Sequence, residues 1–220
     1  PPLAGEQRVG PTITAMADYR ANPVLSQRYL VEDGAVPHAL VDAARLAMPL
    51  ASGPFGDFLA SERLAKDLLS MRSDGALNHS MVYLGIGHDS ASGRIQLDAS
   101  GNAQVVWPGV AQEPFVARLR AEMSAHAQAF GGRYVDYPRT SPIFGGALTT
   151  VHPLGGCPMA ERGEDGVVNA DGQVFDARIG GAATLANLRV VDGAILPGSV
   201  GVNPLLTIAA LAERAAERFQ

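Results

Sequence analysis

The sequence predicts a mixed fold, α/β or α+β, whose first part is mostly antiparallel. With 220 residues, 47% of them hydrophobic, the chain is long enough to bury a real core. Short β-branched, alternating runs separated by turn residues fill much of the first half, which is typical of paired strands. Segments with helical spacing are interspersed among these runs and also close the chain. This order favours strands and helices packed in layers.

The first third of the chain predicts two strands followed by two helices. Pro11–Arg20 and Ser26–Asp33 have strand composition, with turn chemistry at residues 21–23 between them. Pro37–Leu50 opens with proline and then places apolar residues near helical spacing. Asp57–Leu69 has a similar pattern, and its first residue is a good N-cap.

The middle third predicts a strand, a hairpin and a long helix. Asn78–Gly87 returns to strand composition. Gly93–Trp107 contains two alternating runs around the turn sequence Asp-Ala-Ser-Gly-Asn, which indicates a hairpin. Glu113–Phe130 has helical composition, and the two glycines directly after it predict the stop.

Glycine and proline are dense from Gly145 to Gly201. Two short runs there, Gly172–Asp176 and Leu188–Leu196, have strand composition. Asn203–Phe219 predicts a strong final helix that begins at Asn203 or Pro204, since asparagine suits the cap and proline the first turn. The change in texture predicts a domain boundary near residues 142–146.

Composition narrows the function. A net charge of −5 argues against nucleic acid as a partner, because phosphate binding needs clustered Lys and Arg. The single cysteine excludes an intrachain disulfide. No apolar run reaches the roughly 18 residues of a spanning helix, so we expect no transmembrane segment and a soluble protein, with the compartment, cytoplasmic or secreted, left open.

The stretch TTVHPLGGCPM, residues 149–159, holds a histidine that admits three interpretations. His152 could be a metal ligand, a buried structural imidazole or a catalytic base. Metal binding is disfavoured because neither a second cysteine nor a histidine at ligand spacing accompanies Cys157. A lone histidine is more often structural, yet imidazole is the side chain best suited to accept a proton near neutral pH. Cys157 is expected to be a small buried hydrophobe.

Two further segments suit ligand contacts. The start of the final helix presents unpaired N–H groups and partial positive charge. The glycine-bearing loop before it would suit an anionic ligand group. The alternative is an ordinary capped helix without a ligand, in which the glycines serve only the turn. Asp192-Gly193 ends a β-rich run, where α/β sheets often meet ligands, although the pair is also a common turn.

Two other motifs fail on inspection. Ser199 resembles a nucleophile elbow, but Pro197 occupies the place of the required glycine. His88 lies in GIGHDS, a broken dinucleotide fingerprint that is not at a strand-to-helix turn. Neither motif predicts a hydrolase or a nucleotide site.

Four segments taken together resemble one family. They are TVHPLGGCPM, GVVNADGQVFD, LRVVDGAILPGSVGVNPLLTIAALAER and YLGIGHDS followed by GRIQLD. They are similar, in order, to the C-terminal part of glucose-methanol-choline (GMC) flavin oxidoreductases, and to the cholesterol oxidase-like branch in particular. The resemblance implies a substrate domain with a mixed, largely antiparallel sheet in residues 1–145. Residues 146–220 would complete a Rossmann-like FAD-binding domain.

The resemblance also implies a site. His152 and Asn203 match the family's catalytic pair: His152 would accept or hold the proton of the substrate hydroxyl, and Asn203 would bind the same oxygen or contact the flavin. Asn203, Pro204 and Leu205 would approach the flavin through their backbone, and Asp192 and Gly193 match a second FAD contact. No metal ligands are implied.

The implied partner is a small-molecule alcohol, with a sterol as one candidate. Cholesterol oxidases also use a glutamate for double-bond isomerisation, and Glu32 is a candidate whose local sequence is not diagnostic. The family's GxGxxG segment is expected N-terminal to this sequence. Without that segment, a catalytically incomplete fragment or split subunit that binds a partner chain is the alternative.

Overall fold

A computed structural model describes residues 13–36, 38–45, 62, 65–66, 75–140 and 147–219. The chain forms two compact units. The first comprises residues 1–21, 29–85 and 114–149, and the second comprises residues 22–28, 86–113 and 150–220. The domain boundary that the sequence predicts near residue 145 stays a prediction.

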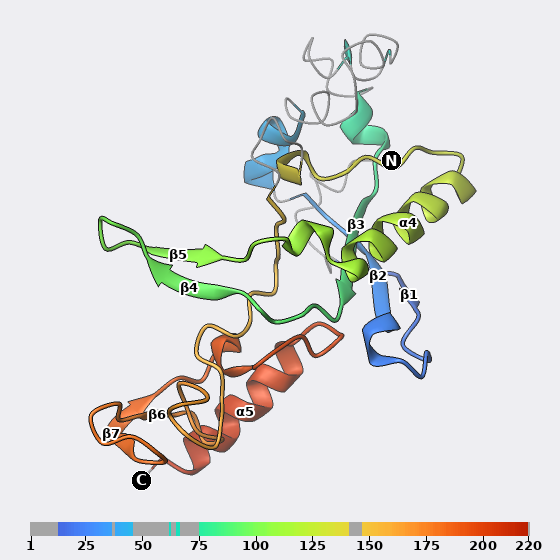
Figure 1. Cartoon of the computed structure of the whole chain (residues 1–220). Coiled ribbons are helices and arrows are strands. Elements are labelled where there is room, and N and C mark those ends of the chain that lie inside the picture. The colour runs from blue at the N-terminus through green and yellow to red at the C-terminus, as the bar shows by residue number, and fades with distance from the viewer. Residues whose placement is uncertain are drawn as a thin grey trace. The chain divides into compact units, whose positions relative to one another are not determined.

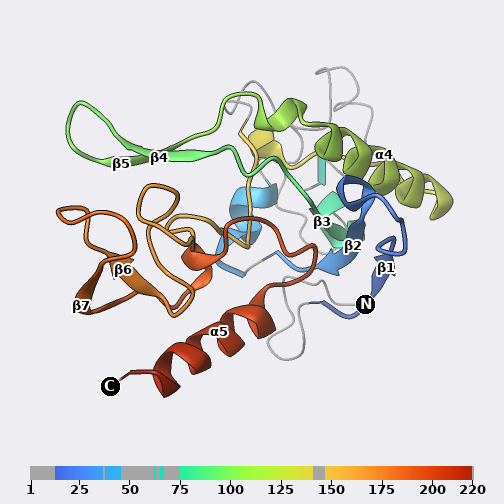
Figure 2. The ribbon, with the colours of Figure 1, turned by 60° about the horizontal axis from the view of Figure 1, so that its bottom comes forward.

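In the first unit a helix covers a small sheet (Figures 1 and 2). Strands β1 (Met16–Asp18), β2 (Tyr29–Gly34) and β3 (Val82–Gly87) lie in that order, and β1 pairs antiparallel with β2. Helix α4 (Pro114–Ala129) contacts β2. The core joins Tyr29 and Val31 of β2 to Leu119 of α4. The last residues of β3 lead into the second unit.

The predicted elements of this unit are confirmed where the structure describes them. The strands are shorter than the predicted runs, and a 3-10 turn, Leu25–Gln27, precedes β2. Helix α4 ends as predicted: Gly131 has φ +71°, and the Gly132 N–H donates to the Ala127 carbonyl at 2.8 Å. Of the two predicted helices between β2 and β3, His38–Leu40 is a 3-10 helix and residues 41–45, 62 and 65–66 are helical. The remainder lies outside the described residues, as do residues 141–146.

The second unit contains two antiparallel strand pairs and the final helix. Strands β4 (Arg94–Leu97) and β5 (Ala103–Val106) form the predicted hairpin. Its turn is held by Asp98, whose Oδ1 accepts the N–H groups of Ser100 and Asn102 at 2.8 and 2.9 Å. Strands β6 (Gln173–Phe175) and β7 (Thr184–Arg189) form the second pair, and helix α5 covers Leu205–Glu217.

The predicted strand Leu188–Leu196 is wrong beyond Arg189, where β7 ends. Asp192 turns the chain into a 3-10 helix, η8 (Gly193–Ile195), because its carboxylate accepts the Ala194 N–H at 2.8 Å. The mixed α/β class with small antiparallel sheets is therefore confirmed, and the Rossmann-like part stays a prediction.

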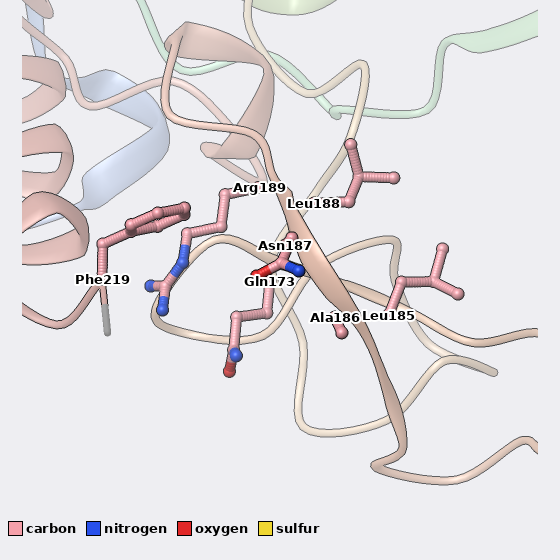
Figure 3. Close-up of a pocket in the computed structure, with 7 residues that line it drawn as sticks. All are labelled: Gln173, Leu185, Ala186, Asn187, Leu188, Arg189 and Phe219. Atoms are coloured by element: carbon pink, nitrogen blue, oxygen red, sulfur yellow. The ribbon is translucent and has the colours of Figure 1, made fainter.

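Arg189 fixes the C-terminal end of α5 to β7. Its guanidinium donates to the carbonyls of Asp171, Ala215 and Arg218 and lies 5.3 Å from the Phe219 ring centre. These two side chains border a pocket along β7, which Figure 3 shows. At 1.5 Å per residue, α5 is about 20 Å long, and Phe219 lies just beyond its C-terminal end. None of the described helices is both long and apolar enough to cross a membrane.

Candidate functional site

The segment that carries His152 has no regular secondary structure and is fixed by backbone hydrogen bonds. The His152 N–H donates to the Thr150 hydroxyl at 3.0 Å, and the His152 side chain is half-buried. Further along, the N–H groups of Cys157 and Met159 donate to the carbonyls of Ala194 and Ile195, both at 2.9 Å. The histidine segment is thus joined to η8 and its flanking residues.

Gly193 lies where three predicted site segments meet. A Cβ at this position would be 3.1 Å from Leu154 Cδ2, 3.1 Å from Ile208 Cδ1 and 3.2 Å from the Pro153 carbonyl oxygen. Leu154 follows His152 by two residues, and Ile208 belongs to the first turns of α5. The absence of a side chain at Gly193 therefore lets the histidine segment and the final helix approach the same turn.

The final helix begins one residue later than predicted, at Leu205. The Pro204 carbonyl accepts the Ile208 N–H at 2.9 Å, so Pro204 occupies the N-cap position. The Pro204 side chain makes no capping hydrogen bond, and Asn203 precedes the N-cap position. Pro204 is buried and Asn203 half-buried. The Asn203 side chain is thus not the predicted cap.

The first turn of α5 exposes two large apolar side chains. Leu205 is 72% exposed and Leu206 is 82% exposed. The N–H groups of this turn precede the first intrahelical bond and carry the positive end of the helix dipole. Polar backbone donors and an apolar surface therefore occur together at this helix start.

The sequence alone does not predict the contacts that His88 and Ser199 make. The Ser199 hydroxyl donates to the Gly87 carbonyl at 2.7 Å, and Gly201 packs against the His88 ring. The failed elbow motif explains neither contact. The sequence did contain one indication of the Ser199 contact. Gly198 and Gly201 lie on either side of Ser199, and glycines at such positions let a loop approach another segment closely.

The structure also describes Cys157 and Glu32, two residues for which the sequence suggests a role. Cys157 is partly exposed, so the expectation of a buried hydrophobe is wrong. Its N–H donates to the Ala194 carbonyl, which holds the backbone at this position. Glu32 is 1% exposed in the middle of β2, opposite Met16, in the first unit. Among the described residues, no group of three or more His, Cys, Asp or Glu could hold a metal ion.

Comparison with known proteins identifies the family. The model of the GMC oxidoreductase family matches residues 89–212, which is more than half of the chain and includes His152, Asp192 and Asn203. The chain therefore belongs to the GMC oxidoreductase family.

Individual relatives match a shorter stretch. A cholesterol oxidase from Acinetobacter baumannii is 48% identical over 66 residues, which are 30% of this chain and 10% of that protein. A cholesterol oxidase from Mycobacterium tuberculosis is 45% identical over 67 residues, again 30% of this chain and 10% of the relative. A long-chain-alcohol oxidase from Arabidopsis thaliana is 37% identical over 59 residues, 27% of this chain and 7% of that protein. These matches therefore cover a tenth or less of each relative's length.

Proposed function

We propose that this chain contributes to an FAD-dependent oxidoreductase that converts a CH–OH group to a ketone or aldehyde. In this proposal residues 1–145 contribute to the substrate domain and residues 146–220 complete the FAD-binding domain. The observation that carries it is the meeting of the His152 segment, η8 and α5 at Gly193. Three segments that the resemblance assigns to the family's site thus approach one glycine.

The residues present fit FAD. An isoalloxazine ring combines an apolar surface with a pyrimidine edge that becomes negative on reduction, and the start of α5 offers exposed Leu205 together with backbone donors. Asn203, Pro204 and Leu205 would hold that edge. Asp192 is exposed and can accept hydrogen bonds from hydroxyl groups, and the adjacent Gly193 is half-buried. These two would hold the ribityl and pyrophosphate part.

The chain's own residues would handle the hydroxyl group of the substrate. The His152 imidazole accepts the O–H proton, and the Asn203 amide donates a hydrogen bond to the same oxygen. A bound FAD would supply the redox chemistry, as the acceptor of the hydride that leaves the carbinol carbon. Loss of that hydride and of the O–H proton leaves the carbonyl product, so atoms and electrons balance.

The names of the relatives support a proposal for the substrate class. Cholesterol oxidases and a long-chain-alcohol oxidase are named for alcohols with large apolar bodies, and we propose an apolar alcohol for this chain, with a sterol as one candidate. Glu32 remains the candidate for an isomerase step if the substrate is a sterol with a shiftable double bond.

The test uses the full-length protein that contains this chain. We expect the purified protein to show the visible absorption of an oxidised flavin, and to lose it anaerobically on addition of a sterol or a long-chain alcohol. His152→Ala should lower turnover about 10²- to 10⁴-fold, the usual loss for a general base. His79→Ala, at an exposed histidine, is the matched control and should leave turnover unchanged.

Two results would overturn the proposal: a full-length protein without flavin, or a His152→Ala variant with normal turnover. The alternative of a catalytically incomplete polypeptide is tested separately. Tight stoichiometric binding of FAD to residues 1–220 alone would count against it.

A further inference from the structure

One hydroxyl group connects the loop before α5 to the end of β3. The Ser199 Oγ donates to the Gly87 carbonyl oxygen at 2.7 Å and accepts the Gly201 N–H at 3.1 Å. Ser199 is half-buried and Gly87 buried. Because both partners are backbone groups, the hydroxyl fixes the path of the two chain segments relative to each other.

The same two segments also approach each other closely at Gly201 and, less closely, at Gly198. Gly201 is buried with φ +71°, and a Cβ there would lie 2.6 Å from His88 Nε2. A Cβ at Gly198 would lie 3.7 Å from the Cβ of Ala91. We call residues 87–91 and 198–201 together the loop junction.

The first half of the loop junction is itself held in place. Glu113 accepts the Ser90 N–H at 3.0 Å, the Ser90 hydroxyl at 2.5 Å and the Trp107 indole N–H at 3.1 Å. Carboxylate acceptors make strong hydrogen bonds. The segment with His88 therefore offers a fixed support to the loop that leads into α5.

We propose that Ser199 and His88 are positioning residues for Asn203. Asn203 follows Gly201 by two residues, a chain distance of about 7 Å at most, and the buried Pro204 cap fixes its other side. The backbone at Asn203 is thus held from both ends. The inference rests on the proposed role of Asn203 in binding the alcohol oxygen, and neither Ser199 nor His88 needs to contact the substrate.

Hydrogen exchange of the 220-residue chain tests the junction without any substrate. Ser199→Ala and His88→Ala should each accelerate amide exchange in peptides that cover residues 198–206 about 5- to 10-fold, the effect of losing one typical hydrogen bond or a comparable contact. Ser199→Thr keeps the hydroxyl and should restore slow exchange. The controls are Ser100→Ala, in the exposed hairpin turn, and His79→Ala, and neither should change it.

Kinetics of the full-length protein tests the positioning role. Ser199→Ala should lower kcat about 10- to 100-fold with KM nearly unchanged, because a displacement of about 1 Å costs up to about 10²-fold in rate. Ser199→Thr should recover most of kcat. If Ser199→Ala does not fold, Ser199→Cys replaces it, since a thiol is a weak donor and should give a smaller loss in the same direction.

The outcomes separate this inference from the proposed function. Unchanged exchange in both variants overturns the junction, and faster exchange with normal kcat overturns positioning. If the unaltered protein oxidises no alcohol, the proposed function and the positioning role that depends on it both fail, while the exchange data still decide whether the junction exists.

Discussion

Replacing Gly201 by alanine measures how tightly the loop before α5 packs against His88. At φ +71° an L side chain costs about 1–2 kcal/mol. The new Cβ would lie 2.6 Å from His88 Nε2 and 3.0 Å from its Cε1, and such overpacking costs about 1–3 kcal/mol more. We therefore expect Gly201→Ala to lower the free energy of unfolding by about 2–5 kcal/mol.

A double-mutant cycle separates the two contributions. In a His88→Ala background the ring is absent, so Gly201→Ala should cost only the backbone strain, about 1–2 kcal/mol. The coupling energy should then be about 1–3 kcal/mol. Gly101→Ala calibrates the strain alone, since Gly101 has φ +82° and no atom within 4 Å of the added Cβ. The free energy of unfolding is measured by equilibrium urea unfolding, monitored by circular dichroism. If Gly201→Ala lowers it equally in both backgrounds, Gly201 does not pack against the His88 ring.

Two other predictions concern packing and pH. Gly193→Ala should lower the free energy of unfolding by about 1–3 kcal/mol, because the added Cβ would press on Leu154 and Ile208. The control is Gly198→Ala, whose Cβ would meet only an ordinary contact at 3.7 Å; it should change the free energy of unfolding by about 0.5 kcal/mol at most. Equal effects of the two substitutions in urea unfolding would contradict this prediction. Hydrogen bonds from the Thr14 hydroxyl and from the Thr14 and Ala15 N–H groups lower the pKa of Asp33 below its ordinary value of 3.8. Asp33 therefore stabilises the fold above that pH, and its contribution is lost as the pH falls through the lowered pKa. The difference in free energy of unfolding between the natural protein and Asp33→Asn should narrow on acidification. A difference that stays constant with pH would contradict the lowered pKa of Asp33.

Local chemistry was enough to predict several elements from the sequence. The hairpin depends on Asp98 and a turn glycine close to it in sequence, and α4 ends just before Gly131 and Gly132. The run after Leu188 was misjudged because β-branched composition favours a strand, whereas the Asp192 side chain diverts the chain into η8. The helix start shifted by one residue because the Pro204 carbonyl accepts the first helical bond.

The site was predictable as separate segments but not as an arrangement. Sequence similarity pointed to His152, Asp192 and Asn203. The bonds from Cys157 to Ala194 and from Ser199 to Gly87 join residues distant in sequence, and no local pattern encodes such pairs. The sequence around His88 is a broken fingerprint and gives no other signal, because the contact of His88 with Gly201 depends on tertiary packing.

The central claim is that His152 and Asn203 act on one hydroxyl group, and the rate of anaerobic flavin reduction by an alcohol tests it most directly. The full-length protein, His152→Ala, Asn203→Ala and the double variant should be compared in single-turnover mixing. If the two residues act as a unit, each single variant slows reduction and the double variant is about as slow as the slower single one. Fully additive losses, or a normal rate in either single variant, would contradict the account.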